Sequence, residues 1–139
     1  MRFAEEDDFV RFNSSASIGN TIDVKKTPMV SGRMGSGTVH HIAFRANDFN
    51  DHEEWRNLLE ENEYGPTPVV DRQYFNAIYF RDEGGILFEI ATDPPGFAKD
   101  EDPDEMGIKL LLPPWLEEKR PEIERVLEPA NARVLEGDK

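Results

Sequence analysis

One helical segment followed by a series of strand-like segments is the feature that most limits how this chain can fold. Thr38–Ala46 is predicted to be a buried strand. A helix is then expected to start at Asn50, where Glu53 would complete a capping box, and to end near Tyr64 before Gly and Pro. The apolar face of this helix carries Trp55, Leu58 and Leu59.

Further strand signals cluster after the helix. A short strand is predicted for Pro68–Arg72, a stronger one for Gln73–Arg81 and a last one for Ile86–Ala91, with a turn at Asp82–Gly85. The resulting order is β-α-β-β-β. This order predicts an α+β fold in which one helix accompanies a small sheet.

The segments on either side have a different character, so we expect three regions: 1–37, 38–97 and 98–139. The acidic stretch Met1–Asp8 is expected to be frayed, and Phe9–Phe12 with Thr21–Val24 is predicted to form a hairpin. Ser31–Gly37 has the composition of a linker. In the last region we expect an acidic loop and a helical tail, Trp115–Leu127, that Pro121 turns or kinks.

The charge of the chain excludes several classes of partner. There are 16 Lys and Arg residues against 29 Asp and Glu residues, a net charge of −13. Such a surface repels nucleic acid and anionic membranes, so we expect neither as a partner. With no membrane-length apolar run, no secretion signal and no cysteine, a cytoplasmic location is expected. The acidity also leaves open whether the host is halophilic.

One acidic residue stands apart from the solvated majority. Glu89 lies in the middle of the apolar strand Ile86–Ala91, where a buried carboxylate costs several kcal/mol unless it is paired. His40 and His41 interrupt the first predicted strand in the same way. Because adjacent strand residues face opposite sides, only one of the two histidines is expected to share a face with Glu89.

An imidazole and a carboxylate without sulfur suit a divalent first-row metal. Two alternatives to a metal stay open. His40 or His41 could be a core residue whose ring nitrogens are hydrogen-bonded, and Glu89 could form an ion pair with Arg45 or Arg81. His52 is a poor further ligand, since its acidic neighbours in the first helical turn suggest exposure to solvent. Alternation leaves Tyr79 free to line a cavity, and Arg72 could meet an anionic substrate oxygen.

Several stretches of the chain match a known family: GSGTVHHIAFR at 35–45, DRQYF at 71–75, IYFR at 78–81, GGILFEIATDPPGF at 84–97 and LPPWLE at 112–117. On these strings the chain closely resembles the C-terminal part of ring-cleaving hydroquinone dioxygenases. These enzymes belong to the glyoxalase/bleomycin-resistance/dioxygenase superfamily, also called the vicinal oxygen chelate superfamily.

The resemblance implies a βαβββ module that pairs with a second module to form an incomplete barrel around a metal. His41 and Glu89 match metal ligands of the family, and His40, Arg72 and Tyr79 match positions that assist catalysis. The implied metal is Fe(II), with Mn(II), Ni(II) or Zn(II) as alternatives. The implied reaction is O2-dependent cleavage of a small aromatic substrate beside a hydroxyl group.

The family's third ligand, another histidine, comes from a half that has no counterpart in this sequence. The segment 1–37 then resembles the remnant of a preceding module. We therefore expect a partner, either a second copy of the chain or a separate N-terminal half. A symmetric homodimer would give a glyoxalase-like site of two His and two Glu, suited to a lyase or isomerase. A non-catalytic module that binds small molecules is the remaining alternative.

Overall fold

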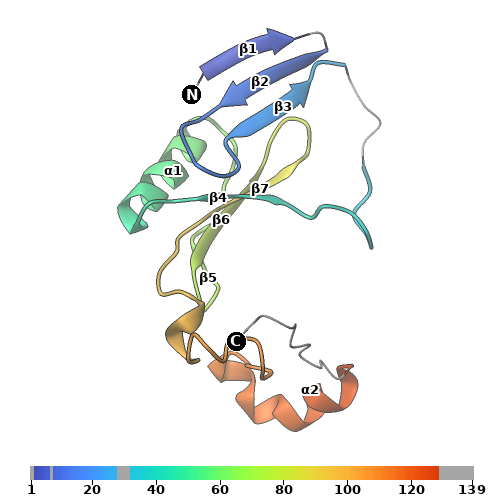
Figure 1. Cartoon of the computed structure of the whole chain (residues 1–139), viewed down its shortest axis with the longest axis vertical. Coiled ribbons are helices and arrows are strands. Elements are labelled where there is room, and N and C mark those ends of the chain that lie inside the picture. The colour runs from blue at the N-terminus through green and yellow to red at the C-terminus, as the bar shows by residue number, and fades with distance from the viewer. Residues whose placement is uncertain (1, 7, 28–31, 129–139) are drawn as a thin grey trace. The chain divides into compact units, whose positions relative to one another are not determined.

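The computed structural model describes residues 2–6, 8–27 and 32–128, and divides into two compact units (Figure 1). The first unit is Met1–Thr38 and the second is Val39–Lys139. Each unit is described by itself below.

The first unit is a three-stranded antiparallel sheet in the order β1-β2-β3. Its strands are β1 (Arg2–Glu6), β2 (Phe9–Asn13) and β3 (Thr21–Lys25). The predicted hairpin is therefore present as β2 and β3, and a bidentate pair from Arg11 to Asp23, at 2.7 and 2.6 Å, ties these strands together. The prediction of a frayed start is wrong, because β1 pairs along its whole length with β2 and so satisfies its backbone groups.

The second unit contains a four-stranded sheet in the order β4-β7-β6-β5. Its elements are β4 (Ile42–Arg45), α1 (Phe49–Glu61), β5 (Val70–Asp71), β6 (Asn76–Arg81) and β7 (Leu87–Ala91). β4 and β7 are parallel, and the other pairs are antiparallel. This arrangement confirms the predicted α+β class and the β-α-β-β-β order, and the described strands close no barrel.

Several predicted boundaries differ from the structure: β5 is shorter than Pro68–Arg72, β6 begins at Asn76 rather than Gln73, and α1 ends at Glu61 rather than near Tyr64. The first strand begins at Ile42 rather than Thr38, since its pairing with β7 starts with Ile42 opposite Phe88. The helix is capped by Asp48 rather than Asn50: the Asp48 carboxylate accepts hydrogen bonds from the backbone N–H groups of Asn50 and Asp51 at 2.8 and 2.9 Å. Asp48 thereby satisfies two helix donors that have no partner within the helix.

Alternation along the strands gives the sheet of the second unit two different faces. The buried core lies on one face, where Ile78 and Ile90 pack with Leu59 of α1 and with Ala46. Phe44 and Phe80 complete this cluster from the same face. Since Cβ directions alternate along a strand, Tyr79 and Glu89 belong to the opposite face. The core side chains and the Glu89 side chain therefore lie on opposite faces of the sheet.

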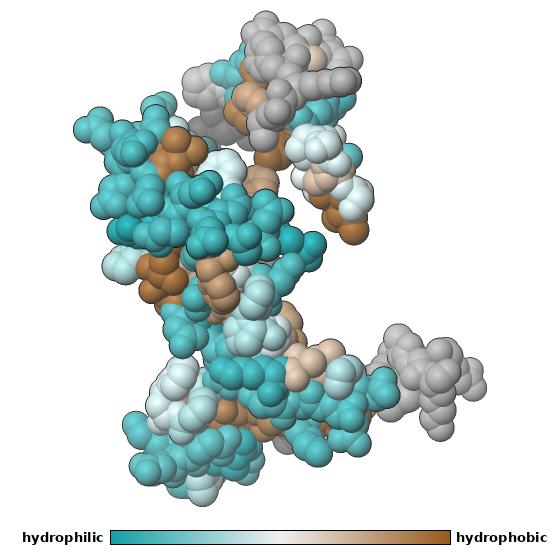
Figure 2. All heavy atoms as spheres, turned by 90° about the vertical axis from the view of Figure 1, so that its left-hand side faces the viewer, coloured by the Kyte–Doolittle hydropathy of each residue, from teal (hydrophilic) through white to brown (hydrophobic). Residues whose placement is uncertain are grey.

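The remainder of the second unit is a loop with short helical turns. These are η1 (Phe97–Lys99), η2 (Pro114–Lys119) and α2 (Arg120–Val126), so the predicted tail helix is divided, with Pro121 in the first turn of α2. Hydrophilic residues cover most of the face drawn in Figure 2, in keeping with the large negative charge. None of the helices in the described ranges is long and apolar enough to cross a bilayer.

Candidate functional site

His41 and Glu89 meet although they are far apart in the sequence. The parallel pairing of β4 with β7 sets Ala43 opposite Glu89, and His41 precedes Ala43 by two residues. The Nε2 atom of His41 lies 2.9 Å from Oε2 of Glu89. The Glu89 side chain is 6% exposed, whereas that of His41 is 37% exposed. The contact thus joins a buried carboxylate to a partly exposed histidine.

His40 contacts His41 directly. Their Nδ1 atoms are 2.9 Å apart, and the two rings meet edge to face. The rule that strand neighbours point to opposite faces does not apply to this pair, because both residues precede β4. As a result, the second histidine stands next to the His41–Glu89 pair rather than on the far side of the sheet.

Tyr79 and Arg72 join the same region from β6 and from the residue after β5. Tyr79 is directly opposite Glu89 in the β6–β7 ladder, and Arg72 Cζ lies 5.7 Å from the centre of the Tyr79 ring. Burial raises the pKa of the Tyr79 phenol, the Glu89 charge raises it further, and Arg72 opposes the shift. Tyr79 is consequently a protonated phenol at neutral pH, available as a hydrogen-bond donor.

The alternative ion pairs for Glu89 are not formed. Arg45 Nε lies 3.0 Å from Oδ1 of Asp93, and Arg81 Nη1 donates to the carbonyl oxygen of Gly85 at 2.7 Å. The structure thus brings His41, rather than either arginine, to the buried carboxylate.

The predicted exposure of His52 is wrong. His52 is only 2% exposed, and its Nε2 lies 2.9 Å from the carbonyl oxygen of Ile90. Its acidic neighbours suggested solvent, but helical periodicity places it on the core face, seven residues before the buried Leu59. His52 ties α1 to the strand that carries Glu89, so its role in the fold differs from that of His40 and His41.

The His41–Glu89 pair fits a divalent metal by donor type and by spacing. Two donor atoms that share a metal at about 2.1 Å each, near a right angle, lie about 3 Å apart. The observed 2.9 Å between Nε2 and Oε2 agrees with that separation. In residues 2–6, 8–27 and 32–128, no group of three or more His, Asp or Glu side chains gathers in a way that could hold a metal. The described residues therefore offer two ligands.

Gln73 is a residue near this site that the sequence reasoning missed. It is 7% exposed and has a positive φ of 70°, which is unusual for a residue other than glycine. Its side chain donates to Asp100 in the loop after β7. Pattern analysis assigned Gln73 to the start of a strand, and no periodicity signals a buried amide in a turn.

Comparison with known proteins gives the same family as the sequence strings. A family model for the glyoxalase/bleomycin resistance protein/dioxygenase superfamily matches residues 2–90. The Bacillus subtilis protein "Putative ring-cleaving dioxygenase MhqO" is 56% identical over 135 residues, which are 97% of this chain and 43% of that protein. The Sphingobium indicum "Chlorohydroquinone/hydroquinone 1,2-dioxygenase" is 36% identical over 97 residues, which are 68% of this chain and 29% of that protein.

A solved structure agrees in fold as well as in sequence. The crystal structure of a "putative dioxygenase from Bacillus subtilis subsp. subtilis str. 168" matches with a TM-score of 0.89 and 55% identity, over 97% of this chain and 44% of that chain. The chain therefore spans less than half the length of the relatives that it matches. The resemblance found in the sequence is confirmed, and the chain belongs to the glyoxalase/bleomycin resistance protein/dioxygenase superfamily.

Proposed function

We propose that this chain contributes a metal-binding His–Glu pair and substrate-facing residues to a dioxygenase that cleaves hydroquinone-type aromatic rings. The observation that carries the proposal is the contact between the buried Glu89 carboxylate and His41, at 2.9 Å, on the sheet face opposite the core. The names of the relatives, which refer to ring cleavage and to hydroquinone, support this substrate class.

His41 Nε2 and Glu89 Oε2 would hold the metal, for which Fe(II) is proposed. A bound Fe(II) would supply the redox chemistry with O2 and would lower the pKa of a phenolic substrate hydroxyl. Tyr79, kept protonated by burial and by the Glu89 charge, can donate a hydrogen bond to a substrate oxygen. The Arg72 guanidinium lies over the Tyr79 ring and can stabilise negative charge that develops on that oxygen.

His40 is proposed to handle a proton beside the metal pair. Its ring contacts that of His41 through the two Nδ1 atoms, which leaves the Nε2 atom of His40 directed elsewhere. Imidazole is the side chain best suited to exchanging protons near neutral pH. If Nε2 of His41 holds the metal, Nδ1–H of His41 would donate to Nδ1 of His40, so Nε2–H of His40 would be a proton donor to a substrate oxygen, and Tyr79 would keep its own proton.

A further ligand is proposed to come from outside the described residues. Two ligands bind a divalent metal weakly, and most protein sites of this type use three. An N-terminal half such as the longer relatives possess would add a histidine and complete a facial triad. A second copy of this chain would instead add another His41 and Glu89, giving the four-ligand set of a glyoxalase-like lyase or isomerase.

Metal loading combined with native mass tests these arrangements. The chain is loaded anaerobically with Fe(II), and bound metal, assembly mass and O2 uptake with hydroquinone and methylhydroquinone are measured. The dioxygenase proposal expects O2 uptake that depends on His41 and Glu89 and is absent from His41→Ala and Glu89→Ala. Asp93→Asn is the matched control, because Asp93 is an exposed carboxylate paired with Arg45.

Each outcome separates the candidates. One metal for each two chains, without O2 uptake, would favour the symmetric glyoxalase-like site. Failure to bind Fe(II), Mn(II), Ni(II) or Zn(II) would favour a non-catalytic binding module. A fully loaded chain that stays inactive after addition of the relative's N-terminal half would refute the ring-cleavage proposal.

A further inference from the structure

Gln73 combines two features that are unfavourable for folding. Its φ of 70° lies in the left-handed region, where a side chain with Cβ is strained. It is also more than nine-tenths buried, and among the described residues its Oε1 is a buried side-chain acceptor without a hydrogen-bond partner. A glycine would adopt this turn without strain and without a buried unsatisfied oxygen. The amide must therefore serve something that a glycine could not supply.

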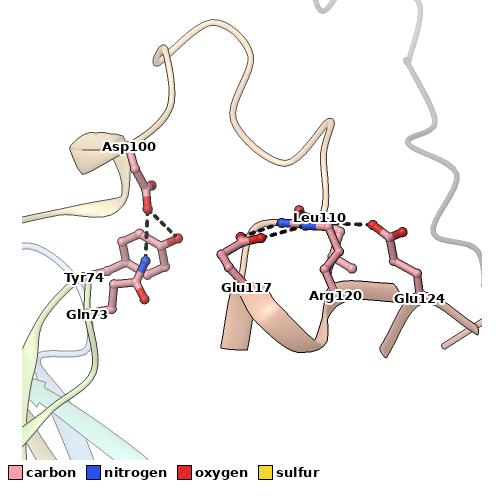
Figure 3. A network of polar contacts seen from close by, with 7 residues as sticks. All are labelled: Gln73, Tyr74, Asp100, Leu110, Glu117, Arg120 and Glu124. Carbon is pink, nitrogen blue, oxygen red and sulfur yellow. Dashed lines mark hydrogen bonds and ion pairs between the residues drawn. The ribbon is translucent and has the colours of Figure 1, made fainter. Parts of the chain in front are cut away.

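The rest of the Gln73 residue is firmly held by three hydrogen bonds. Its backbone N–H donates to Oδ1 of Asp71 at 2.7 Å, and its carbonyl oxygen accepts from Lys99 Nζ at 3.3 Å. Its Nε2 donates to Oδ2 of Asp100 at 3.0 Å, and Tyr74 Oη donates to the same oxygen at 3.3 Å. Figure 3 shows the amide nitrogen directed at Asp100 and the amide oxygen directed away from it.

These contacts connect the segment after β7 to the turn that carries Arg72. Phe97 stacks on Tyr74 with ring centres 5.3 Å apart, and the backbone N–H of Gly96 donates to the carbonyl oxygen of Tyr74 at 2.8 Å. The turn is closed by the backbone N–H of Arg72, which donates to the carbonyl oxygen of Phe75 at 2.9 Å. Several contacts thus hold the turn beside Arg72, and the Gln73–Asp100 hydrogen bond is the one that the Gln73 side chain makes.

We infer that Gln73 is a positioning residue for Arg72. The Gln73–Asp100 hydrogen bond holds the left-handed turn, and this turn keeps the Arg72 guanidinium over the Tyr79 ring. The inference rests on the proposed function in one respect: that function is what gives Arg72 and Tyr79 a role in contacting the substrate. The contact between them exists in the metal-free chain, where it can be measured without turnover.

The test uses NMR of the Arg72 side chain in the metal-free chain. A guanidinium over an aromatic ring feels the ring current, so the Arg72 Nε–Hε resonance should move when Tyr79→Leu removes the ring. Gln73→Glu should move this resonance in the same direction and by most of the same shift, because a carboxylate cannot donate to Asp100 and is repelled by it. Asp104→Asn, an exposed change in the same loop, should leave the resonance in place.

A reversed pair separates positioning from general damage to the fold. Combining Gln73→Glu with Asp100→Asn restores one hydrogen bond with donor and acceptor exchanged, and should return the Arg72 resonance toward its original position. Gln73→Gly can adopt the positive φ without strain, but it no longer ties the turn to Asp100, so Arg72 should still be displaced. The inference is overturned if Gln73→Glu folds with an unchanged Arg72 resonance, or if the reversed pair does not restore it.

The same variants distinguish failure of this inference from failure of the proposed function. If the resonance responds as expected but no variant, including the unaltered chain, consumes O2 with hydroquinone after Fe(II) loading and addition of the relative's N-terminal half, then Gln73 positions Arg72 and the ring-cleavage proposal is wrong. If the unaltered chain is active and the Arg72 resonance ignores Gln73→Glu, then the ring-cleavage proposal stands and the positioning role is wrong.

Discussion

Replacing Glu89 with glutamine should make the metal-free chain more stable while removing its affinity for metal. The substitution keeps the size of the side chain and lets the new amide oxygen accept a hydrogen bond from His41. It removes a negative charge from a residue that is only 4% exposed. His41 is left with its side chain 37% exposed, so water can still solvate its ring. The change therefore leaves no buried charge without a partner.

The expected size of the effect follows from two opposed contributions. A hydrogen bond to a charged group contributes about 1.5–3 kcal/mol, against about 0.5–1.5 kcal/mol for a neutral one, so roughly 1 kcal/mol is lost. The desolvation penalty of a buried carboxylate, several kcal/mol in magnitude, is relieved. We expect the free energy of unfolding to rise by about 1–2 kcal/mol, and Tm by roughly 3–6 °C.

Urea unfolding with and without metal measures both effects. A metal at about 100 times its Kd stabilises a folded site by about 2.7 kcal/mol. The unaltered chain should gain this increment with Fe(II) or Mn(II), and Glu89→Gln should not. Asp93→Asn should keep the increment and change the metal-free stability by less than about 0.5 kcal/mol, as surface substitutions do.

Two results would refute this reasoning. If metal-free Glu89→Gln loses more than about 1 kcal/mol of unfolding free energy, the carboxylate stabilises the metal-free fold. The argument that its burial destabilises the fold would then be wrong. An undiminished increment with metal in Glu89→Gln would mean that Glu89 is not a ligand.

Three further predictions concern the core, α1 and alkaline pH. Ile78→Ala, at a fully buried position, should lower the free energy of unfolding by about 2–5 kcal/mol in urea. His52→Ala should lower it by about 2–3 kcal/mol, because the Ile90 carbonyl loses its donor, and His52→Gln should recover part of this loss. The raised pKa of Tyr79 contributes stability that is present below about pH 10 and lost as the pH rises through the folded value. Stability measured from about pH 8 to 11, which spans the ordinary tyrosine pKa, should therefore decline more steeply in the unaltered chain than in Tyr79→Phe, and parallel curves would contradict the assignment.

The strands and the helix of the second unit could be predicted because hydrophobic periodicity is a local property. Ile78 and Ile90 lie where alternation predicts, and Glu89 stood out because a carboxylate does not fit that alternation. The contact of Glu89 with His41 could only be anticipated through resemblance to a family. Spacing alone left Arg45 and Arg81 as equal candidates, because sequence does not state which strand lies beside β7.

The missed features depend on tertiary contacts or on helix phase. Gln73 has a positive φ because Asp71, Lys99 and Asp100 hold its polar groups, and none of these contacts has a sequence signature. His52 was a different case, since the phase of the helix already pointed it at the core. Its charged neighbours favour exposure to solvent, whereas its spacing from Leu59 favours the core face of the helix. The structure agrees with the spacing.

The parallel pairing of β4 with β7 also has a consequence for the order of assembly. Ile42 pairs with Phe88 across the whole intervening α1, β5 and β6, so this ladder closes a long loop. Contacts between residues so far apart in the sequence form late in folding. Closing the loop between them costs conformational entropy, and this cost is offset only after other contacts have formed. A nascent or partly unfolded chain thus lacks the His41–Glu89 pair altogether. A metal that needs both residues as ligands would therefore be retained only by molecules in which the β4–β7 ladder has formed.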